Sequence, residues 1–339
     1  MIKRFENYPL KNHHTFGLNV YAKFYYEYST TNDLLEILGD PLLTNHACLL
    51  LGGGSNLLFL EDFKGLVLHS AILGIEVVEA DEKTVVVKVG AGVDWDALVE
   101  WSVTNGFGGL ENLSWIPGDV GAAPVQNIGA YGVEFKDVFV KAEGVYMHNG
   151  QSFSIEKDAC AFGYRDSIFK NELKNKVIIT RVYIRLDKDP EFLLDYGHVR
   201  KAVEKLGAPS LKNVRQAIVD IRSEKLPDPK VFGNAGSFFK NPVVDASVLA
   251  AIRARYPDVP FYEMADNQMV KIPAGWLIEK AGWKGQSLGQ AAVHQHQALV
   301  LINMGQASGR EILVLAEKIE ADIKHKFNIV LHREVNVVG

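Results

Sequence analysis

The sequence predicts an α+β fold with a larger N-terminal region and a smaller C-terminal α/β region. Strand-like apolar runs and helix-like amphipathic segments are mixed along all 339 residues. The run Leu226-Pro227-Asp228-Pro229 is a stiff breaker, which predicts a domain boundary at this point. The length suits two or three domains, and 47% hydrophobic with 23% charged residues is an ordinary globular composition.

The N-terminal region is expected to contain short strands and three helices. Apolar and aromatic runs predict strands at residues 20–29, 47–51, 75–80, 84–89, 138–148 and 177–186, with a hairpin joining 75–80 to 84–89. Helices are predicted from residue 31 to about 39, at 94–104 and at 211–225. In the helix at 94–104, one apolar face is formed by Trp95, Leu98, Val99 and Ser102.

The C-terminal region alternates helices and strands in the same way. Helices are predicted at residues 246–255, 274–281 and 310–326, and strands at 298–303 and 329–338. Because both element types occur after the breaker, this region has the makings of a domain of its own.

Charge and composition exclude several classes of protein. The net charge is −5 and the basic residues are scattered, so no nucleic acid partner is expected. No apolar run of about eighteen residues occurs and the N-terminus lacks an apolar signal core, so we expect a cytoplasmic protein without membrane contact. The two cysteines, Cys48 and Cys160, lie among apolar neighbours and are predicted to be buried free thiols.

A first glycine-rich segment, Gly52-Gly53-Gly54-Ser55-Asn56, follows the strand predicted at 47–51. Its glycines let backbone amides crowd against an anion, and a tight turn is the alternative interpretation. No Gly-Lys-Ser/Thr follows, so this is not a P-loop. The run Gly90-Ala91-Gly92 is interpreted as an ordinary turn between a strand and a helix, because Trp95 occupies the place of a third glycine.

A second glycine-rich segment, residues 108–132, holds six glycines and two prolines and almost no periodicity. A structureless loop of this length in a compact domain is usually functional, although a surface Ω-loop is the alternative. Gln126 and Asn127 can each donate and accept hydrogen bonds, which suits a heterocycle or a ribose. Two glycine-rich segments in one half of the chain favour an extended dinucleotide.

Five motifs in a fixed order make the chain resemble a known family. GGGSN, IPGxVGxxPxQNIGAYG, FGYRDS, KLPDP and GNAGSFFKNP together resemble the UDP-N-acetylenolpyruvoylglucosamine reductases of the longer subclass, within the flavoproteins of the p-cresol methylhydroxylase type. The matching segments run from about Asn12 to the C-terminus. The resemblance implies an FAD-binding domain of that type followed by a C-terminal α/β substrate-binding domain.

The resemblance also implies a division of the chain into three parts. Residues 1–70, completed by 327–339, would form a first FAD-binding subdomain, and residues 71–226 a second one. Residues 227–326 would bind the UDP-sugar.

The implied cofactor is FAD, with its pyrophosphate on the Gly52–Asn56 turn and on the backbone from Gly118 to Ala122. The positions that carry over as cofactor-binding are Gly52, Gly53, Gly54, Ser55, Asn56, Ile116, Pro117, Gly118, Gly121, Ala122, Gln126, Asn127, Gly129, Ala130 and Tyr131.

The implied reaction is the NADPH-dependent, FAD-mediated reduction of UDP-N-acetylenolpyruvoylglucosamine to UDP-N-acetylmuramate, a step in cell-wall precursor synthesis. Arg165 would bind the substrate carboxylate through its planar fork, and a salt bridge to Asp166 is the alternative. Ser237 would donate a proton to the enol, and a turn residue is the alternative. Glu334 would assist enol formation, although Arg333 precedes it where many relatives have proline, and an exposed strand carboxylate is the alternative.

Further residues would bind the substrate. Lys225 and Asn241 would face the diphosphate or the sugar, Tyr196 and Tyr262 would close over the nucleotide, and Gln297 would contact the substrate. Without the resemblance, the two tyrosines would be interpreted as core or rim aromatics. His294 and His296 lack acidic neighbours, so no metal site is expected.

Two rival functions remain at this stage. A related FAD-dependent sugar or alcohol oxidase would tether its flavin through a histidine or cysteine, for which His46 and His69 are the nearest candidates. A nucleotide-sugar binding protein without catalysis is the other rival. The partners expected are NADPH and the UDP-sugar, acting on a monomer.

Overall fold

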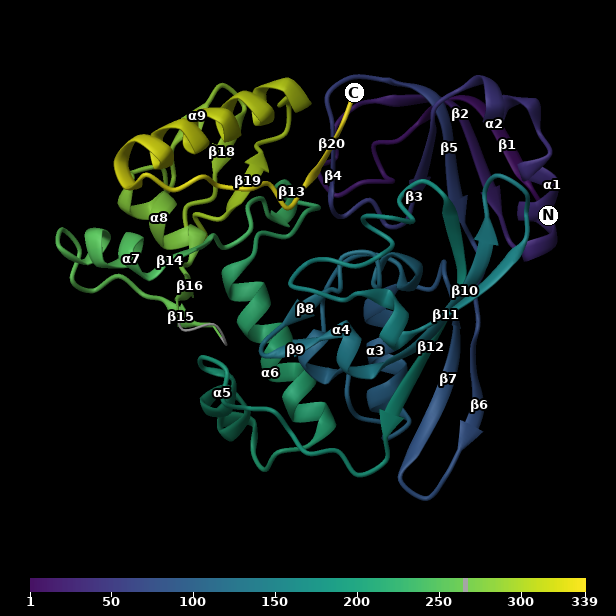
Figure 1. Ribbon diagram of the computed structural model, residues 1–339, viewed down its shortest axis with the longest axis horizontal. Helices are drawn as coiled ribbons and strands as arrows, with labels where there is room; N and C mark the ends of the chain where they lie inside the picture. The colour runs from purple at the N-terminus through teal and green to yellow at the C-terminus, as the bar shows by residue number, and fades with distance from the viewer. Residues whose placement is uncertain (265–267) are drawn as a thin grey trace. The chain divides into compact units, whose positions relative to one another are not determined.

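The computed structural model describes residues 1–264 and 268–339 (Figure 1). These residues divide into two compact units. The first unit comprises Met1–Tyr8, Ala22–Gly53 and Lys64–Glu224, and the second unit comprises Pro9–Tyr21, Gly54–Phe63 and Lys225–Gly339. The chain passes from the first unit to the second for the last time between Glu224 and Lys225, immediately before the predicted breaker. Residues 327–339 fall in the same unit as 225–326, and the three-part division stays a prediction.

A four-stranded sheet in the first unit leads the chain into the first glycine segment. Its order is β1-β2-β5-β3, with the bounds Lys3–Pro9, Tyr21–Tyr28, Phe63–Ser70 and Cys48–Leu51 respectively. Helix α1, Thr31–Leu38, buries Leu34 and Ile37 against this sheet and is capped by Thr30 in a capping box with Asp33. A short helix α2, Pro41–Asn45, follows. Because β3 ends at Leu51, Gly52 is the first residue beyond the sheet.

The second sheet of the first unit has five antiparallel strands. Its order is β11-β10-β12-β7-β6, with the bounds Ser152–Glu156, Phe139–Tyr146, Val177–Asp187, Thr84–Gly90 and Ile75–Ala80. The predicted hairpin is therefore β6–β7. Helix α3, Trp95–Thr104, buries Trp95, Leu98, Val99 and Ser102, which confirms the predicted face. The Trp95 indole also donates to the Leu113 carbonyl at 2.9 Å, fixing the helix to the second glycine segment.

The second glycine segment is more ordered than its composition predicts, so the prediction of a structureless loop was wrong. Within it lie the short 3-10 helices η1 Glu111–Leu113 and η2 Val120–Ala122 and the strand β8 Gly129–Ala130, and it is followed by β9 Val133–Glu134 and α4 Phe135–Val138. Each is too brief to show a period in sequence, which is why the pattern missed them. A further 3-10 turn, η3 Lys157–Cys160, and the helices α5 Val199–Leu206 and α6 Leu211–Lys225 complete the unit.

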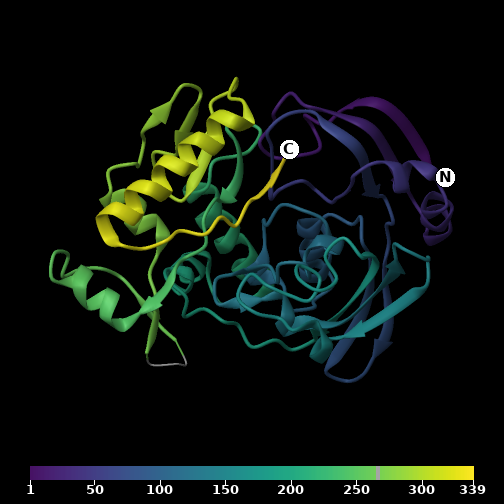
Figure 2. The same ribbon diagram turned by 45° about the horizontal axis from the view of Figure 1, so that its top comes forward.

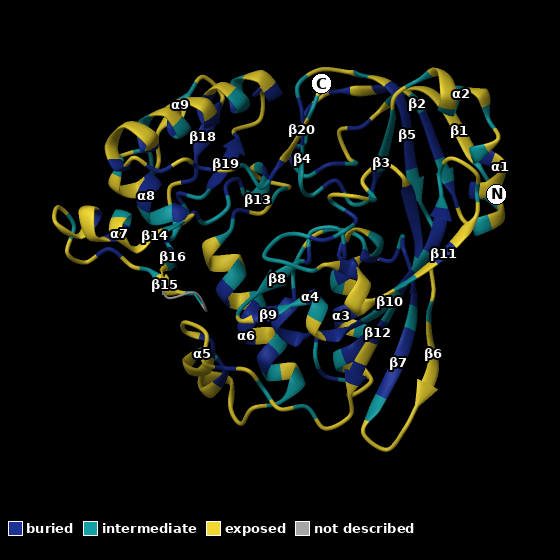
Figure 3. Cartoon of the chain, in the orientation of Figure 1, coloured by how far each residue is buried: buried dark blue, intermediate teal, exposed yellow. Residues whose placement is uncertain are grey.

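The second unit is built on an antiparallel sheet covered by a long helix. The sheet order is β13-β19-β18-β17, with the bounds Gly233–Ser237, Val300–Asn303, Ala291–Val293 and Ser287–Leu288. Helix α9, Gly309–Phe327, lies along this sheet with one buried face (Figures 2 and 3). The remaining elements are the sheet β14-β16-β15, at Val243–Asp245, Met269–Lys271 and Tyr262–Glu263, the helices α7 Ala246–Arg253 and α8 Ala274–Lys280, and the parallel pair β4 Leu57–Phe59 with β20 Asn336–Val338.

The C-terminal strand is shorter than the predicted 329–338, because only Asn336–Val338 is a strand. The residues before it follow another path, in which the Glu334 amide donates to the Phe238 carbonyl at 2.8 Å and the Lys240 amide to the His332 carbonyl at 2.8 Å. Residues 332–334 pair with the segment around Phe238 and Lys240, whereas residues 336–338 pair with β4. This change of partner ends the strand before residue 336, and an apolar run in the sequence gives no sign of it.

Both cysteines are free thiols, as predicted, but only Cys160 is fully buried and Cys48 is half-buried. Within residues 1–264 and 268–339, none of the helices combines the length and the apolar character needed to cross a bilayer.

We expect Gly309→Ala to destabilise the second unit although alanine favours helices. An added Cβ would lie 1.8 Å from the Phe59 carbonyl oxygen, so β4 or the start of α9 must shift. Overpacking of this kind lowers the free energy of unfolding by about 1–3 kcal/mol. Gly39→Ala is the matched control, because its Cβ would meet nothing nearer than 3.4 Å. Equal urea midpoints for the two variants would contradict the prediction.

Candidate active site

The two glycine segments meet in the first unit. A Cβ added to Gly53 would lie 2.8 Å from the Gly118 Cα, and one added to Gly52 would lie 3.4 Å from the Ala122 Cβ. Gly52–Gly53 and Gly118–Ala122 are therefore in van der Waals contact, and we call them the paired glycine segments. A side chain at position 53 would separate them, which explains the glycine there.

Backbone hydrogen bonds attach the second of the paired segments, Gly118–Ala122, to the turn between β7 and α3. The Gly121 amide donates to the Ala91 carbonyl and the Val120 amide to the Val93 carbonyl, both at 2.9 Å. The Trp95 amide donates to the Gly118 carbonyl at 2.8 Å. The turn at Gly90–Gly92 therefore does more than join a strand to a helix, since it supports the glycine loop. The Ala122 amide donates to the Asp119 carbonyl at 2.9 Å. Within Gly118–Ala122, the backbone amides of Gly118 and Asp119 are therefore the two that donate to no carbonyl of the described residues.

The rest of the GGGSN motif belongs to the second unit. Gly54 has φ +62° and lies so close to His13 that an added Cβ would be 2.1 Å from the His13 carbonyl oxygen. The Asn56 side-chain amide donates to the Glu334 carbonyl at 3.1 Å, and the Asn56 carbonyl accepts from the Asn336 amide at 3.0 Å. The buried Thr15 hydroxyl, whose own amide donates to the Gly54 carbonyl, has no hydrogen-bond partner in the described chain.

Four non-glycine residues with left-handed backbone lie along the site segments. Trp115, Asn127, Tyr131 and Arg165 have φ of 60°, 45°, 49° and 55°. Such conformations are disfavoured for residues with a Cβ and are found mainly where surrounding contacts enforce them, often at functional sites.

Asn127 ties the second glycine segment to the FGYRDS segment. Its side-chain amide donates to Glu134 Oε2 at 3.1 Å and to the Gly163 carbonyl at 3.0 Å, and its Oδ1 accepts from the Lys136 amide at 2.9 Å. The side chain is fully buried. These hydrogen bonds of the Asn127 side chain are thus all made within the protein. Any contribution of Asn127 to cofactor binding is therefore indirect, through the shape of the backbone of the second glycine segment.

Arg165 lies beside the far end of the same loop. Its Nη2 donates to the Gly129 carbonyl at 2.7 Å, and Lys170 Nζ donates to its carbonyl at 3.1 Å. The Asp166 carboxylate accepts from the Asn171 side-chain amide at 3.0 Å. The guanidinium is therefore directed to the glycine loop at Gly129.

A second arginine, Arg222, belongs to this cluster and was missed in the sequence. Its Nε donates to the Trp115 carbonyl at 3.2 Å, and its side chain shares a hydrogen bond with the Tyr131 hydroxyl. Burial and the nearby Arg165 both lower the pKa of Arg222, with burial the larger cause. Helical spacing was the available signal, since Arg222 follows Ile218 by four residues at the edge of the buried face of α6.

A partly buried ion pair fixes the start of the loop. Asp96 on α3 receives two hydrogen bonds from Arg215 on α6, at 2.7 and 2.9 Å, and one from the Trp115 amide at 2.5 Å. These contacts hold the pKa of Asp96 below its usual range against the opposing effect of burial. Trp115 is thereby bound through its amide by Asp96 and through its carbonyl by Arg222.

The second unit brings together two of the three predicted catalytic residues. Ser237 ends β13 and pairs with Val300, and the next residue, Phe238, accepts the Glu334 amide through its carbonyl. Phe238 and Phe239 are each 1% exposed, which anchors the chain on both sides of this contact. Arg333 forms two hydrogen bonds with Glu320 on α9, at 2.6 and 2.8 Å, so the residue found in place of proline is bound to that helix.

The predicted substrate residues fall into separate groups. Tyr196 packs edge-on against Tyr131 in the first unit, with ring centroids 6.1 Å apart. In the second unit, Asn241 Oδ1 accepts from the Ala274 amide at 2.9 Å, and Gln297 Oε1 is 3.3 Å from the position a Gly275 Cβ would take. Both amides are thus at the start of α8.

The other two are exposed. Tyr262 in the second unit is 44% exposed beneath Lys271 Nζ, which is 5.7 Å from the ring centre. Lys225 is exposed at the end of α6. His294 and His296 stack edge-on, and the described residues contain no group of three or more His, Cys, Asp or Glu placed to hold a metal.

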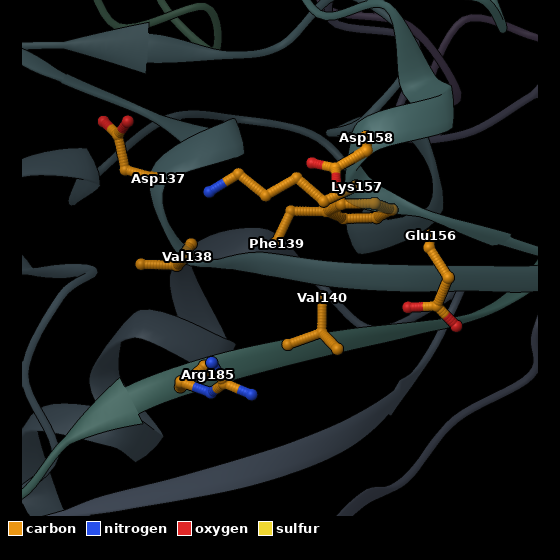
Figure 4. A pocket seen from close by; sticks show the side chains of 8 residues that line it. All are labelled: Asp137, Val138, Phe139, Val140, Glu156, Lys157, Asp158 and Arg185. Atoms are coloured by element: carbon orange, nitrogen blue, oxygen red, sulfur yellow. The ribbon is translucent and has the colours of Figure 1, made fainter.

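A separate pocket of about 240 Å³ in the first unit contains none of the predicted site residues (Figure 4). It is lined by Asp137, Val138, Phe139, Val140, Glu156, Lys157, Asp158 and Arg185. Its charges are mixed and its rim is polar, so we assign no function to it.

These features fit a dinucleotide. The paired glycine segments place bare backbone where side chains would block an anion. The FAD-binding domain family matches residues 22–155, which include both segments. The first unit is therefore that of an FAD-binding flavoprotein, which confirms the predicted fold and cofactor.

The C-terminal domain of UDP-N-acetylenolpyruvoylglucosamine reductase matches residues 228–338. The reductases of that name from Bacteroides fragilis and Pseudomonas putida are each 47% identical to this chain over 98% of its length. The matched region covers 99% of the Bacteroides protein and 98% of the Pseudomonas protein. The crystal structure of the reductase from Thermus caldophilus shares the fold, with a TM-score of 0.70, 23% identity and coverage of 100% and 99%. The chain belongs to the UDP-N-acetylenolpyruvoylglucosamine reductase family.

We expect Gly53→Ala to weaken FAD binding at least about tenfold, because a Cβ 2.8 Å from the Gly118 backbone forces the paired segments apart. Gly52→Ala is the matched control, since its nearest contact at 3.4 Å is an ordinary one. Titration of the apoprotein with FAD, followed by quenching of flavin fluorescence, measures both affinities. A Gly53→Ala protein that binds as tightly as the Gly52→Ala protein would contradict the assignment.

Proposed function

We propose that this protein reduces the enolpyruvyl double bond of UDP-N-acetylenolpyruvoylglucosamine, with NADPH as reductant, to give UDP-N-acetylmuramate. The near full-length match to reductases of that name is the observation that carries the proposal. The FAD-binding domain and the family's C-terminal domain together account for most of the chain. We further propose that the protein acts as a monomer in the cytoplasm, where NADPH and nucleotide sugars are made.

When bound, FAD supplies the hydride that adds to the double bond. What remains for the protein is to bind the substrate, to stabilise the negative charge that develops toward its carboxylate, and to protonate the adjacent carbon. Arg165 suits the carboxylate, because its guanidinium can form two parallel hydrogen bonds and keeps its charge. Its bond to the Gly129 carbonyl fixes its direction before substrate arrives. Arg222 adds positive charge to the same cluster.

Ser237 is the proposed proton donor. A hydroxyl is a weak acid, so it can serve only a strongly basic carbon that approaches closely. The buried Phe238 and Phe239 fix the backbone that carries it, and this rigidity supports a donor that must be accurately placed. Glu334, whose amide is bound to the Phe238 carbonyl, is the proposed partner that assists enol formation.

The remaining substrate contacts are proposed for residues that offer suitable chemistry. Exposed Lys225 offers a cation for the diphosphate, and the half-exposed rings of Tyr196 and Tyr262 offer stacking faces for the nucleotide. Asn241 and Gln297 offer amides beside α8 for the sugar. We propose the three-part division of the chain given above as the arrangement in which these groups act.

The decisive assay follows NADPH oxidation with and without UDP-N-acetylenolpyruvoylglucosamine. The reductase oxidises NADPH rapidly only when the enolpyruvyl sugar is present. An oxidase would instead release peroxide steadily under air with a sugar or alcohol alone. Purified protein that is colourless and takes up no FAD would contradict both enzymes.

Ser237→Ala is expected to slow substrate reduction by about 10²–10⁴-fold, because it removes only the proton donor. Bleaching of the flavin absorbance by NADPH in the absence of substrate should keep its normal rate. Stopped-flow measurement of the two steps separates them, with the exposed Ser287→Ala as control. If the variant slowed flavin reduction by NADPH and substrate reduction equally, the role of Ser237 would not be confined to protonation.

Arg165→Lys is expected to lower kcat/KM for the UDP-sugar by about ten- to a hundredfold, since a point charge cannot replace two hydrogen bonds to a carboxylate. Steady-state kinetics measures this. Arg185→Lys on the exposed side of β12 is the matched control. An unchanged kcat/KM for Arg165→Lys would place the substrate carboxylate elsewhere.

A further inference from the structure

A carboxyl group lies in the paired glycine segments themselves. Asp119 follows Gly118, and its Oδ1 is 3.2 Å from the position a Gly53 Cβ would take, while its Oδ2 is 3.5 Å from that of Gly52. An acid is unexpected here, because the FAD pyrophosphate is itself a dianion and like charges at close range repel.

The surroundings of Asp119 do little to stabilise its charge. Among the described residues, the titratable groups that act on it are the Asp94 carboxylate, at the start of α3, and the Tyr25 hydroxyl of β2. Asp94 accepts the Ala97 amide at 2.8 Å as the cap of α3, and its neighbour Val93 and the following Trp95 pair with the backbone on either side of Asp119. Burial raises the pKa of Tyr25, so this hydroxyl stays neutral.

We propose that Asp119 makes FAD binding depend on pH: the paired glycine segments bind FAD with this carboxyl protonated, and binding takes up a proton from solvent when Asp119 is ionised. The inference rests on the proposed cofactor site. A protonated carboxyl removes the repulsion and adds an O–H donor beside the amides of Gly118 and Asp119.

The direction in which FAD affinity changes with pH follows from the pKa of Asp119 in the protein without FAD. Burial, with a smaller contribution from Asp94, raises the pKa of Asp119 from 3.8 to about 7. Below that pH the carboxyl is mostly protonated and FAD affinity is constant. Above it each further pH unit lowers the affinity by at most about tenfold, because one proton must be bound along with FAD. The pyrophosphate is a diester and keeps its charge throughout, so FAD contributes no slope.

The test is the dissociation constant of FAD from about pH 6 to about pH 8.5, measured by fluorescence quenching, where up to about thirtyfold weakening is expected. Asp119→Asn should give a flat profile and bind FAD more tightly than the natural protein at the alkaline end. Asp119→Ser, which also lacks the charge, should do the same. Asp158→Asn, on the rim of the separate pocket, is the control and should keep the natural slope.

Two further measurements sharpen the test. Asp94→Asn keeps a capping side chain but removes the like charge, so the fall in affinity should begin at a lower pH. Calorimetric titration of the natural protein with FAD in two buffers of different ionisation enthalpy should show proton uptake at alkaline pH, and this needs no variant.

A flat profile in the natural protein, or an unchanged slope in Asp119→Asn, would overturn the inference while leaving the flavin assignment intact. Failure of the natural protein to bind FAD at any pH would overturn the proposed function and this inference together.

Discussion

Contact between the backbones of Gly53 and Gly118 is the constraint on which the cofactor site of the first unit depends. It requires a strand, β3, that ends at Leu51, and a loop held from behind by Ala91 and Val93. A single added methyl group at position 53 would collide with the opposing main chain at 2.8 Å. Protein backbones in packed interiors cannot give way without moving their neighbours, so the absence of a side chain here is as informative as any charged group.

Around this contact the first unit stores conformational strain that several polar groups balance. Trp115 is held in a left-handed conformation by Asp96 and Arg222, and Asp96 is in turn bound by Arg215. Arg165 and Asn127, also left-handed, are bound to Gly129 and to Gly163 respectively. The arginines thereby serve the loop as well as the anions we propose for it. Charged groups held in advance need little rearrangement when a ligand arrives.

In the second unit the end of the chain returns to complete the proposed proton-donor site. The Glu334 amide binds the residue after Ser237, and the Glu334 carbonyl accepts from Asn56, so three motifs distant in sequence are joined by two hydrogen bonds. The Arg333 side chain that precedes Glu334 is bound by Glu320 on α9. Arg333 thus has a side-chain partner thirteen residues earlier in the chain.

The sequence by itself determined the element types with strong periods, the buried face of α3, the breaker at residues 226–229, and the family with its cofactor. Each depends on residue spacing or on a local motif. Only the tertiary structure showed that residues 111–138 form short 3-10 helices, strands and a helical turn, and that residues 332–334 leave the last strand. It alone also showed that Arg222 lies beside Tyr131 and Arg165, and Asp119 beside Gly52 and Gly53. These features arise from contacts between segments far apart in the chain, for which a linear pattern carries no signal.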